Sequence, residues 1–359
     1  MRGVCEAIVA LALGLAVGMG GGQAHAKLGG DEMSQARQVV EGWVSNVRSQ
    51  WNIEHSLIYS RAEIQVVAAW EDVESGADVA DEMGAVAPIT SMAAARWASQ
   101  RRSPLAVGKT VAVIFEGGQV DGEALYVSNG VSLAVGQRVR LRLALQPTGD
   151  YRIVGGAGGA AVLDGEGEVT RPEQALPSTA RRWGRDRLPV PYFVSASMPD
   201  VTGEEDAVRA AFATWQEVDC SYMAYTYQGV SERTEGGRDG DNTVSWGQTD
   251  GSLAKTRWWV DASGSLTEFD IIFAEDRRWG IDGAADRFDI QNAATHEAGH
   301  TLVLDDLYDP QAAERVMYGY IRKGEIHKRA LHRDDIASIC ALYPRDELSI
   351  RTYLPLVRH

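Results

Sequence analysis

Residues 296–318 decide the fold class, and they read HEAGHTLVLDDLYDPQAAERVMY. The first five residues contain His296 and His300, with Glu297 between them. Two side chains four residues apart on an α-helix lie on one face about one turn apart, so both imidazoles can bind a single zinc ion. The carboxylate of Glu297 would then lie beside a water bound to that ion. A pair of helical histidines that bind no metal is the alternative.

The segments around this motif alternate between short strands and longer helices. We expect one helix at residues 289–304 and a last helix at residues 333–342. An earlier helix should begin with a capping box, in which Thr202 and Glu205 bond each other's backbone N–H groups. Its apolar residues fall on one stripe: Val208, Phe212 and Trp215. Strands are expected at residues 191–196, 242–246, 256–260 and 266–273.

The sequence before this part is typical of β structure. Apolar and polar residues alternate at residues 58–66 and 138–145. Turn signals separate such runs at Gly117-Gly118, Asn129-Gly130 and Gly149-Asp150. We therefore expect a small antiparallel β domain, with a helical insertion at about residues 91–99.

The first 26 residues have the features of a signal peptide. Arg2 precedes an apolar run at residues 7–19, and Ala24-His25-Ala26 matches a small-x-small cleavage site. The run is shorter than the ~20 residues that span a membrane. We expect a secreted or extracytoplasmic mature chain that begins at Lys27 and has no stable membrane span.

Charge and cysteine content restrict the partners and the compartment. The 35 Lys and Arg residues are outnumbered by 50 Asp and Glu residues, and the net charge of −15 repels phosphate backbones and anionic lipids. A nucleic-acid partner is therefore not expected. Removal of the signal peptide leaves Cys220 and Cys340, which should form a disulfide in an oxidising compartment. We expect a monomer.

Changes in composition divide the chain into five parts. These are a signal peptide (1–26), an N-terminal β domain (27–168), a polar linker (169–182), a second domain (183–345) and a C-terminal tail (346–359). The predicted fold class is α+β.

The second domain resembles the matrixin-like branch of the metzincin zinc proteases. The likeness rests on the motif and on the segments NTVSW (242–246), TRWW (256–259), EFDI (268–271) and DIASICALYP (335–344). It implies a twisted mixed sheet with three helices, and one catalytic Zn²⁺ bound by His296, His300 and a residue ten positions after the first. It also implies Glu297 as general base and a methionine turn at Met317 beneath the metal. The N-terminal β region is similar to a module that accompanies bacterial secreted proteins of this kind.

Two positions depart from the family pattern, which has glycine where this chain has Val303 and histidine where it has Asp306. A helix continued through residue 306 would carry it about 15 Å from residue 296, far beyond a zinc bond of ~2 Å. The helix must therefore end near residue 302 if Asp306 is to bind the metal. Valine in a left-handed conformation costs roughly 1–2 kcal/mol, which is small beside the order of 10 kcal/mol that a zinc site returns. Because aspartate is an accepted zinc ligand, we expect Asp306 to be the third ligand.

Neighbouring residues leave alternatives open. Asp305 and Asp309 would compete with Asp306 if the helix ended late, and the acidic cluster also fits a solvated loop or a structural Ca²⁺ site. Tyr318 either supports the oxyanion of the reaction or is a packed aromatic residue. Met317 on its own would be an ordinary core residue. Asp270 lies on a strand that borders the cleft in this family, and we give it no catalytic role.

The function predicted from the sequence is that of a secreted zinc endopeptidase that acts on proteins or peptides. Zinc would activate the attacking water and polarise the scissile carbonyl, while Glu297 would transfer the proton to the leaving amine. One alternative is a non-catalytic binding protein on a degenerate metzincin scaffold. Another is a structural or cell-surface protein whose functional part is the β domain. Retention of Glu297, which metal binding alone does not require, favours the enzyme.

Overall fold

The computed structural model describes residues 37–71, 105–128, 130–164, 169–170, 181–196, 201–233 and 236–345. The predicted signal peptide, the helical insertion, most of the linker and the C-terminal tail lie outside these residues. Residues 36–359 belong to one structural unit. Within the described ranges, no helix is long and apolar enough to cross a membrane.

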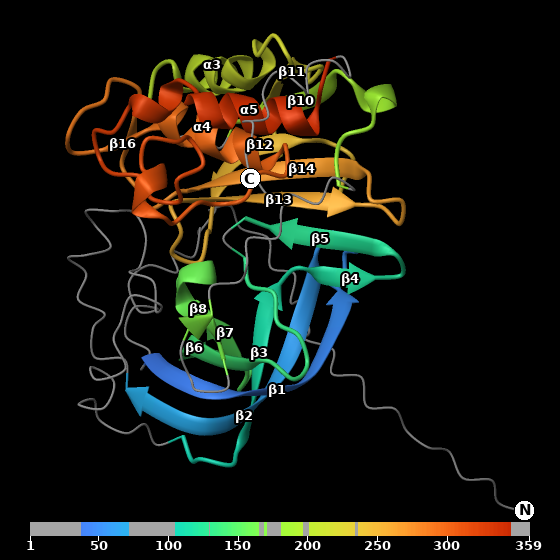
Figure 1. The fold of residues 1–359 in the computed structure, drawn as a ribbon, viewed down its shortest axis with the longest axis vertical. Helices are drawn as coiled ribbons and strands as arrows, with labels where there is room; N and C mark the ends of the chain where they lie inside the picture. Colours follow the sequence, from blue (N-terminus) through green and yellow to red (C-terminus); the bar gives the residue numbers. More distant parts are fainter. Residues whose placement is uncertain are drawn as a thin grey trace, which may run out of the picture. The chain divides into compact units, whose positions relative to one another are not determined.

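The first sheet is built by the N-terminal part of the chain. Its strands are β1 (Arg37–Trp51), β2 (Ile58–Glu71), β3 (Thr110–Glu116), β6 (Arg138–Leu145), β7 (Tyr151–Ile153), β8 (Ala160–Leu163) and β9 (Val169–Thr170). The strand order is β1-β2-β3-β7-β6-β8-β9, and β1 also pairs with β6 (Figure 1). The expected alternation is confirmed in β2, where every second residue from Ile58 to Val66 is buried. The alternation expected at residues 138–145 is wrong, because residues 139–144 of β6 are all buried. The pairing of β3 with β7 is parallel, so the sheet is not wholly antiparallel.

The second sheet has the order β11-β10-β12-β14-β13-β5-β4. Its strands are β10 (Val190–Ser195), β11 (Tyr225–Ser231), β12 (Thr243–Gly247), β13 (Ala254–Val260), β14 (Leu266–Ala274), β4 (Gly118–Val120) and β5 (Glu123–Val127). The sheet is mixed, because β13 runs antiparallel to its neighbours whereas β10, β11, β12 and β14 pair in parallel. The four strands predicted for this part are confirmed to within two residues. The hairpin β4–β5 comes from the N-terminal part of the chain and pairs with β13 (Figure 1).

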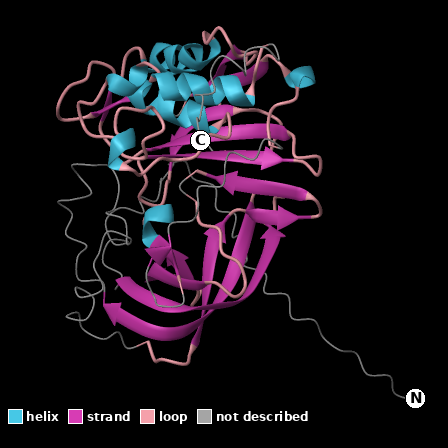
Figure 2. Ribbon diagram, in the orientation of Figure 1, coloured by secondary structure: helices cyan, strands magenta, loops and turns pink. Residues whose placement is uncertain are grey.

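Three α-helices in the described residues lie on one side of the second sheet (Figure 2). They are α3 (Glu204–Gln216), α4 (Ile290–His300) and α5 (Arg333–Leu342). Smaller elements are β15 (Trp279–Gly280), β16 (Phe288–Asp289) and 3₁₀ helices at Gly156–Gly159, Arg185–Arg187, Pro310–Ala312 and His327–Arg329. The predicted α+β class with three helices and a mixed sheet is confirmed for this part.

Helix α3 has the predicted buried stripe but not the predicted capping box. Val208, Phe212 and Trp215 are all buried in the core. The N-cap is Gly203, with a φ of 93° and no hydrogen bond from a capping side chain. The prediction of a box led by Thr202 is wrong because the chain enters the helix one residue later, through a left-handed conformation that glycine adopts without strain.

A disulfide connects the segment after α3 to α5. The structure joins Cys220 to Cys340, with Cα atoms 5.4 Å apart. This is the pairing expected from the sequence. It holds α5 against the core that surrounds α4.

Candidate metal centre

Helix α4 places three polar side chains at one buried point. Asp289 caps the helix by accepting a hydrogen bond of 2.9 Å from the backbone N–H of Asn292. His296, Glu297 and His300 follow, and none is more than 3% exposed. Potential ligand atoms of these three residues lie within 4.8 Å of one another. The Nε2 atoms of the two histidines are 3.2 Å apart, so both rings point to the same spot.

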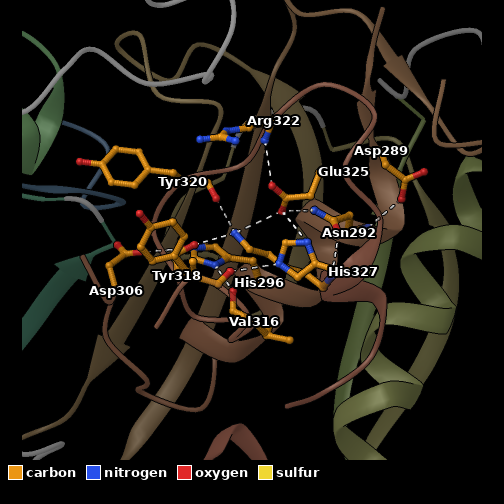
Figure 3. Close-up of polar contacts among 12 residues, drawn as sticks. Asp289, Asn292, His296, Asp306, Val316, Tyr318, Tyr320, Arg322, Glu325 and His327 are labelled. Carbon is orange, nitrogen blue, oxygen red and sulfur yellow. Dashed lines mark hydrogen bonds and ion pairs between the residues drawn. The ribbon is translucent and has the colours of Figure 1, made fainter. Parts of the chain in front are cut away.

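The other ring nitrogen of each histidine is held by a backbone carbonyl. His296 Nδ1 lies 2.7 Å from the carbonyl oxygen of Val316 (Figure 3). His300 Nδ1 lies 2.7 Å from the carbonyl oxygen of Leu304. A carbonyl oxygen only accepts, so each Nδ1 carries the proton and each Nε2 of a neutral ring keeps its lone pair. This is the tautomer and the outer contact typical of zinc-binding histidines.

The chain reverses directly after α4. The helix ends at His300, and Val303 has a φ of 67°. The backbone N–H of Val303 donates to the carbonyl of His300 at 2.9 Å, and that of Leu304 donates to Gly299 at 3.3 Å. The left-handed valine therefore does what glycine usually does at a helix end.

The reversal returns Asp306 to the two histidines. Its Oδ1 lies 3.0 Å from Nε2 of His296 (Figure 3). The same atom lies 3.5 Å from Nε2 of His300. Asp305 is exposed, and the Oδ1 of Asp309 accepts a hydrogen bond from the backbone of Gln311. Of the three aspartates, Asp306 is thus the one that the structure brings to the histidines.

The electrostatics of this cluster suit a cation. Burial raises the pKa of Asp306, but His300 and His296 outweigh it and hold the pKa of the carboxyl well below its usual range. Burial lowers the pKa of His300, whereas Asp306 and Glu297 raise it, and the resulting pKa is about 9. A buried carboxylate needs a compensating positive charge. Two imidazole nitrogens and one carboxylate oxygen form a donor set that zinc accepts.

The carboxylate of Glu297 is held from the side of the sheet. Its Oε2 accepts a hydrogen bond of 2.7 Å from Oγ1 of Thr256 on β13. The Oγ of Ser128, the residue that follows β5, lies 3.5 Å from the same oxygen. Sequence reasoning gave neither residue a role. Thr256 belongs to a segment that resembles the family, whereas Ser128 has no local signal because 169 residues separate it from Glu297.

Met317 lies beneath the helix. It is 3% exposed, and a Cβ atom built on Gly299 would collide with its Sδ and meet a ring carbon of Trp215 at 3.0 Å. Backbone bonds from Leu307 to Met317 (2.8 Å) and from Gly319 to Leu307 (2.9 Å) tie this turn to the segment that carries Asp306. The role of Met317 as a methionine turn beneath a metal stays a prediction.

Tyr318 has the contacts of a packed aromatic residue. Its ring lies beside that of Tyr320 (Figure 3), with the two centroids 5.4 Å apart. The centroid of Tyr318 lies 5.8 Å from Nζ of Lys328. The fully buried Lys328 donates to the carbonyls of both tyrosines, at 2.6 and 2.7 Å. Support of an oxyanion by Tyr318 therefore stays a prediction. Asp270, which was given no catalytic role, accepts a hydrogen bond from the backbone of Thr243.

Comparison with known proteins agrees with this geometry. The family model of the matrixins matches residues 182–344. Karilysin of Tannerella forsythia is 28% identical over 166 residues, which cover 45% of this chain and 33% of karilysin. Human matrilysin is 40% identical over 74 residues, which cover 21% of this chain and 26% of matrilysin. The chain thus spans about a third or less of the length of these two relatives.

The matched region contains α4, the reversal at Val303 and the turn at Met317. It ends before the predicted C-terminal tail and does not include the first sheet or the hairpin β4–β5. Residues 182–344 are therefore similar to the matrixins.

Proposed function

We propose that the chain is a zinc-dependent endopeptidase that hydrolyses peptide bonds in proteins or peptides. One observation carries the proposal. The Nε2 atoms of His296 and His300 and the Oδ1 of Asp306 converge to within 3.5 Å, and Glu297 lies on the same helix. We assign the first three residues as zinc ligands and Glu297 as general base.

The roles of the side chains follow from this arrangement. Zinc bound to the three ligands would supply a Lewis acid that activates water and polarises the scissile carbonyl. Glu297 would accept the proton of the attacking water and deliver it to the leaving amine. The hydrogen bond from Thr256 would keep its Oε2 in one place. Met317 and Gly299 pack closely and support the ligand-bearing turn of α4 from below.

We also propose export of the mature chain and a monomeric state. Support for export comes from the signal-like residues 1–26 and from the Cys220–Cys340 disulfide, which is typical of oxidising compartments. The N-terminal β region would be an accompanying module with the boundary near residue 168 given above. A structural Ca²⁺ ion stays a prediction.

A combined metal and activity measurement tests the function. Purified mature chain should contain about one zinc ion per molecule, and it should cleave casein or gelatin in a manner blocked by a hydroxamate chelator. Zinc content without cleavage would favour the non-catalytic binding protein, provided that no segment of the chain itself blocks the site during the assay. Absence of both would contradict the assignment of the site.

A further inference from the structure

The hairpin β4–β5 occupies the outer edge of β13. Strand β5 pairs antiparallel with β13, with Ala124, Leu125, Tyr126 and Val127 opposite Val260, Trp259, Trp258 and Arg257. The backbone N–H of Ser128 extends the pairing by donating to the carbonyl of Thr256 at 2.7 Å. The other edge of β13 pairs with β14, so both edges of this strand are filled (Figure 1).

This pairing ends at the candidate general base. The Oγ of Ser128 accepts a hydrogen bond of 2.7 Å from the backbone N–H of Thr256 and lies 3.5 Å from Oε2 of Glu297. The ring of Tyr126 stacks on Trp258 at 5.9 Å, and Trp258 in turn stacks on His300 at 6.4 Å. The residue that follows the hairpin therefore approaches Glu297 with its side chain, and Tyr126 is connected to His300 through Trp258.

An ion-pair cluster holds the first sheet to the same strand. Glu116, at the end of β3, receives hydrogen bonds from Lys255 (3.1 Å) and Arg257 on β13. The side chains of all three residues are at most 13% exposed. An exposed ion pair contributes little, but removal of one partner from a buried pair is strongly unfavourable. The ion pairs of Glu116 thus contribute substantially to holding the hairpin β4–β5, which follows Glu116 in the chain, against β13.

An apolar cluster adds to this attachment. It consists of Ile58 of β2, Leu125 of β5 and Trp259 of β13, each at most 1% exposed. Because these side chains come from both parts of the chain, separation of the hairpin from β13 would expose all three.

An extended peptide needs backbone partners in order to be held beside Glu297. Addition of a strand to a free sheet edge supplies them, and the outer edge of β13 is the edge that runs past Glu297 through Thr256. In the structure, β5 has taken this row of N–H and C=O groups. The family match begins at residue 182 and does not include the hairpin, so the occupant is an addition to the protease domain.

We propose that the hairpin β4–β5 is a built-in competitor for peptide at the edge of β13, so that the form with the hairpin seated is latent. This inference rests on the proposed function, since it assigns the same site a means of inhibition. Peptide would bind after the hairpin has left the edge. The apparent affinity for peptide is then reduced in proportion to the small fraction of molecules with a free edge.

A matched pair of substitutions in the full-length chain tests this competition. Glu116→Gln removes the charge that Lys255 and Arg257 share, whereas Glu123→Gln removes a half-exposed partner of Arg238. We expect Glu116→Gln to raise the initial rate of gelatin cleavage about tenfold, which corresponds to ~1.4 kcal/mol of weakened attachment. Glu123→Gln should change the rate by less than about twofold, because exposed pairs contribute little. Equal rates for both variants and the parent, or a lower rate for Glu116→Gln, would contradict the proposal.

A cross-link tests it in the opposite direction. Ala124 and Val260 lie opposite each other in the register, so Ala124→Cys with Val260→Cys should allow a disulfide that fixes the hairpin on β13. The oxidised double variant should cleave gelatin about tenfold or more slowly than the same protein after reduction. The parent chain, treated identically, corrects for reduction of Cys220–Cys340. If the cross-linked chain cleaves as fast as the reduced one, the hairpin does not block the site.

A binding measurement separates this inference from the proposed function. In the Glu297→Ala background, a fluorescein-labelled gelatin peptide should bind about tenfold more tightly when Glu116→Gln is added. Tighter binding with no cleavage by any variant that retains Glu297 would overturn the endopeptidase and keep the competition. If the chain cleaves gelatin but neither Glu116→Gln nor the cross-link changes the rate or the binding, the endopeptidase is kept and the competition is overturned.

Discussion

Helix α4 and the loop that follows it bring their residues to the candidate site in different ways. The helix part of the site is His296, Glu297 and His300, and the loop part contains Asp306 and Met317. His296, Glu297 and His300 share the last turns of α4, so helical periodicity alone sets their relative positions. Asp306 and Met317 arrive through a chain reversal and through packing against distant residues. Sequence spacing therefore suffices to position the helix part, whereas the loop part depends on tertiary structure.

The supports of the loop part come from several elements. Val303 makes the reversal with a positive φ. The backbone N–H of Val316 donates to Oδ2 of Asp335 on α5 at 2.9 Å, and the segments around Leu307 and Met317 bond each other. Loss of any of these supports should disturb the loop part while α4 remains a helix.

The largest effect is expected from the helix part. Glu297→Ala should lower kcat on the order of 10²–10⁴-fold because it removes the proton acceptor. Zinc content, measured on the same preparation, should not change, since the three proposed ligands remain. Gln291→Ala, in the first turn of α4, serves as a control and should keep most of the activity. A Glu297→Ala variant that cleaves gelatin at the parental rate would end the general-base assignment.

The next effect compares two neighbouring carboxylates of the loop part. Asp306→Ala should weaken zinc binding on the order of 100-fold, since loss of even an outer contact of a ligand costs 10–100-fold. Asp305→Ala should have little effect because Asp305 is exposed. Competition with a chromogenic chelator measures both affinities. Equal losses in the two variants would mean that the reversal does not select Asp306.

The sequence was most informative where one short segment contains the whole signal. The motif and four strands of the second sheet (β10, β12, β13 and β14) could be predicted because each depends on local spacing or on a single apolar run. The end of the helix before residue 306 followed instead from the condition that Asp306 reach the histidines. The cap of α3 was mispredicted because Gly203 offers a left-handed entry that competes with Thr202. The bond between Ser128 and Thr256 joins residues 128 positions apart. Such pairing depends on the register of the whole hairpin, which no local pattern contains.

The disulfide tests how far α5 supports the loop part. Cys220→Ala with Cys340→Ala opens a loop with a sequence separation of 120 residues, and it should lower the free energy of unfolding by roughly 3–5 kcal/mol in the chain-entropy model. Urea denaturation of the zinc-loaded chain measures this difference, and the reduced parent chain should match the double variant. A loss below about 1 kcal/mol would show that packing alone holds α5 and Asp335 in place.

The smallest effect isolates the backbone of the reversal itself. In the interior of a helix or strand, a protein with alanine is more stable than the same protein with glycine by about 0.5–1 kcal/mol. At residue 303, where φ is 67°, the order should be inverted, because a Cβ atom in the left-handed region costs roughly 1 kcal/mol that glycine avoids. Val303→Gly should therefore unfold at higher urea than Val303→Ala, although both lose the buried methyl groups of the valine. Val208, buried inside α3, provides the matched pair, and there the alanine variant should be the more stable by about 1 kcal/mol. If alanine is the more stable at both positions, the reversal is not held by a left-handed residue, and the position of Asp306 requires another explanation.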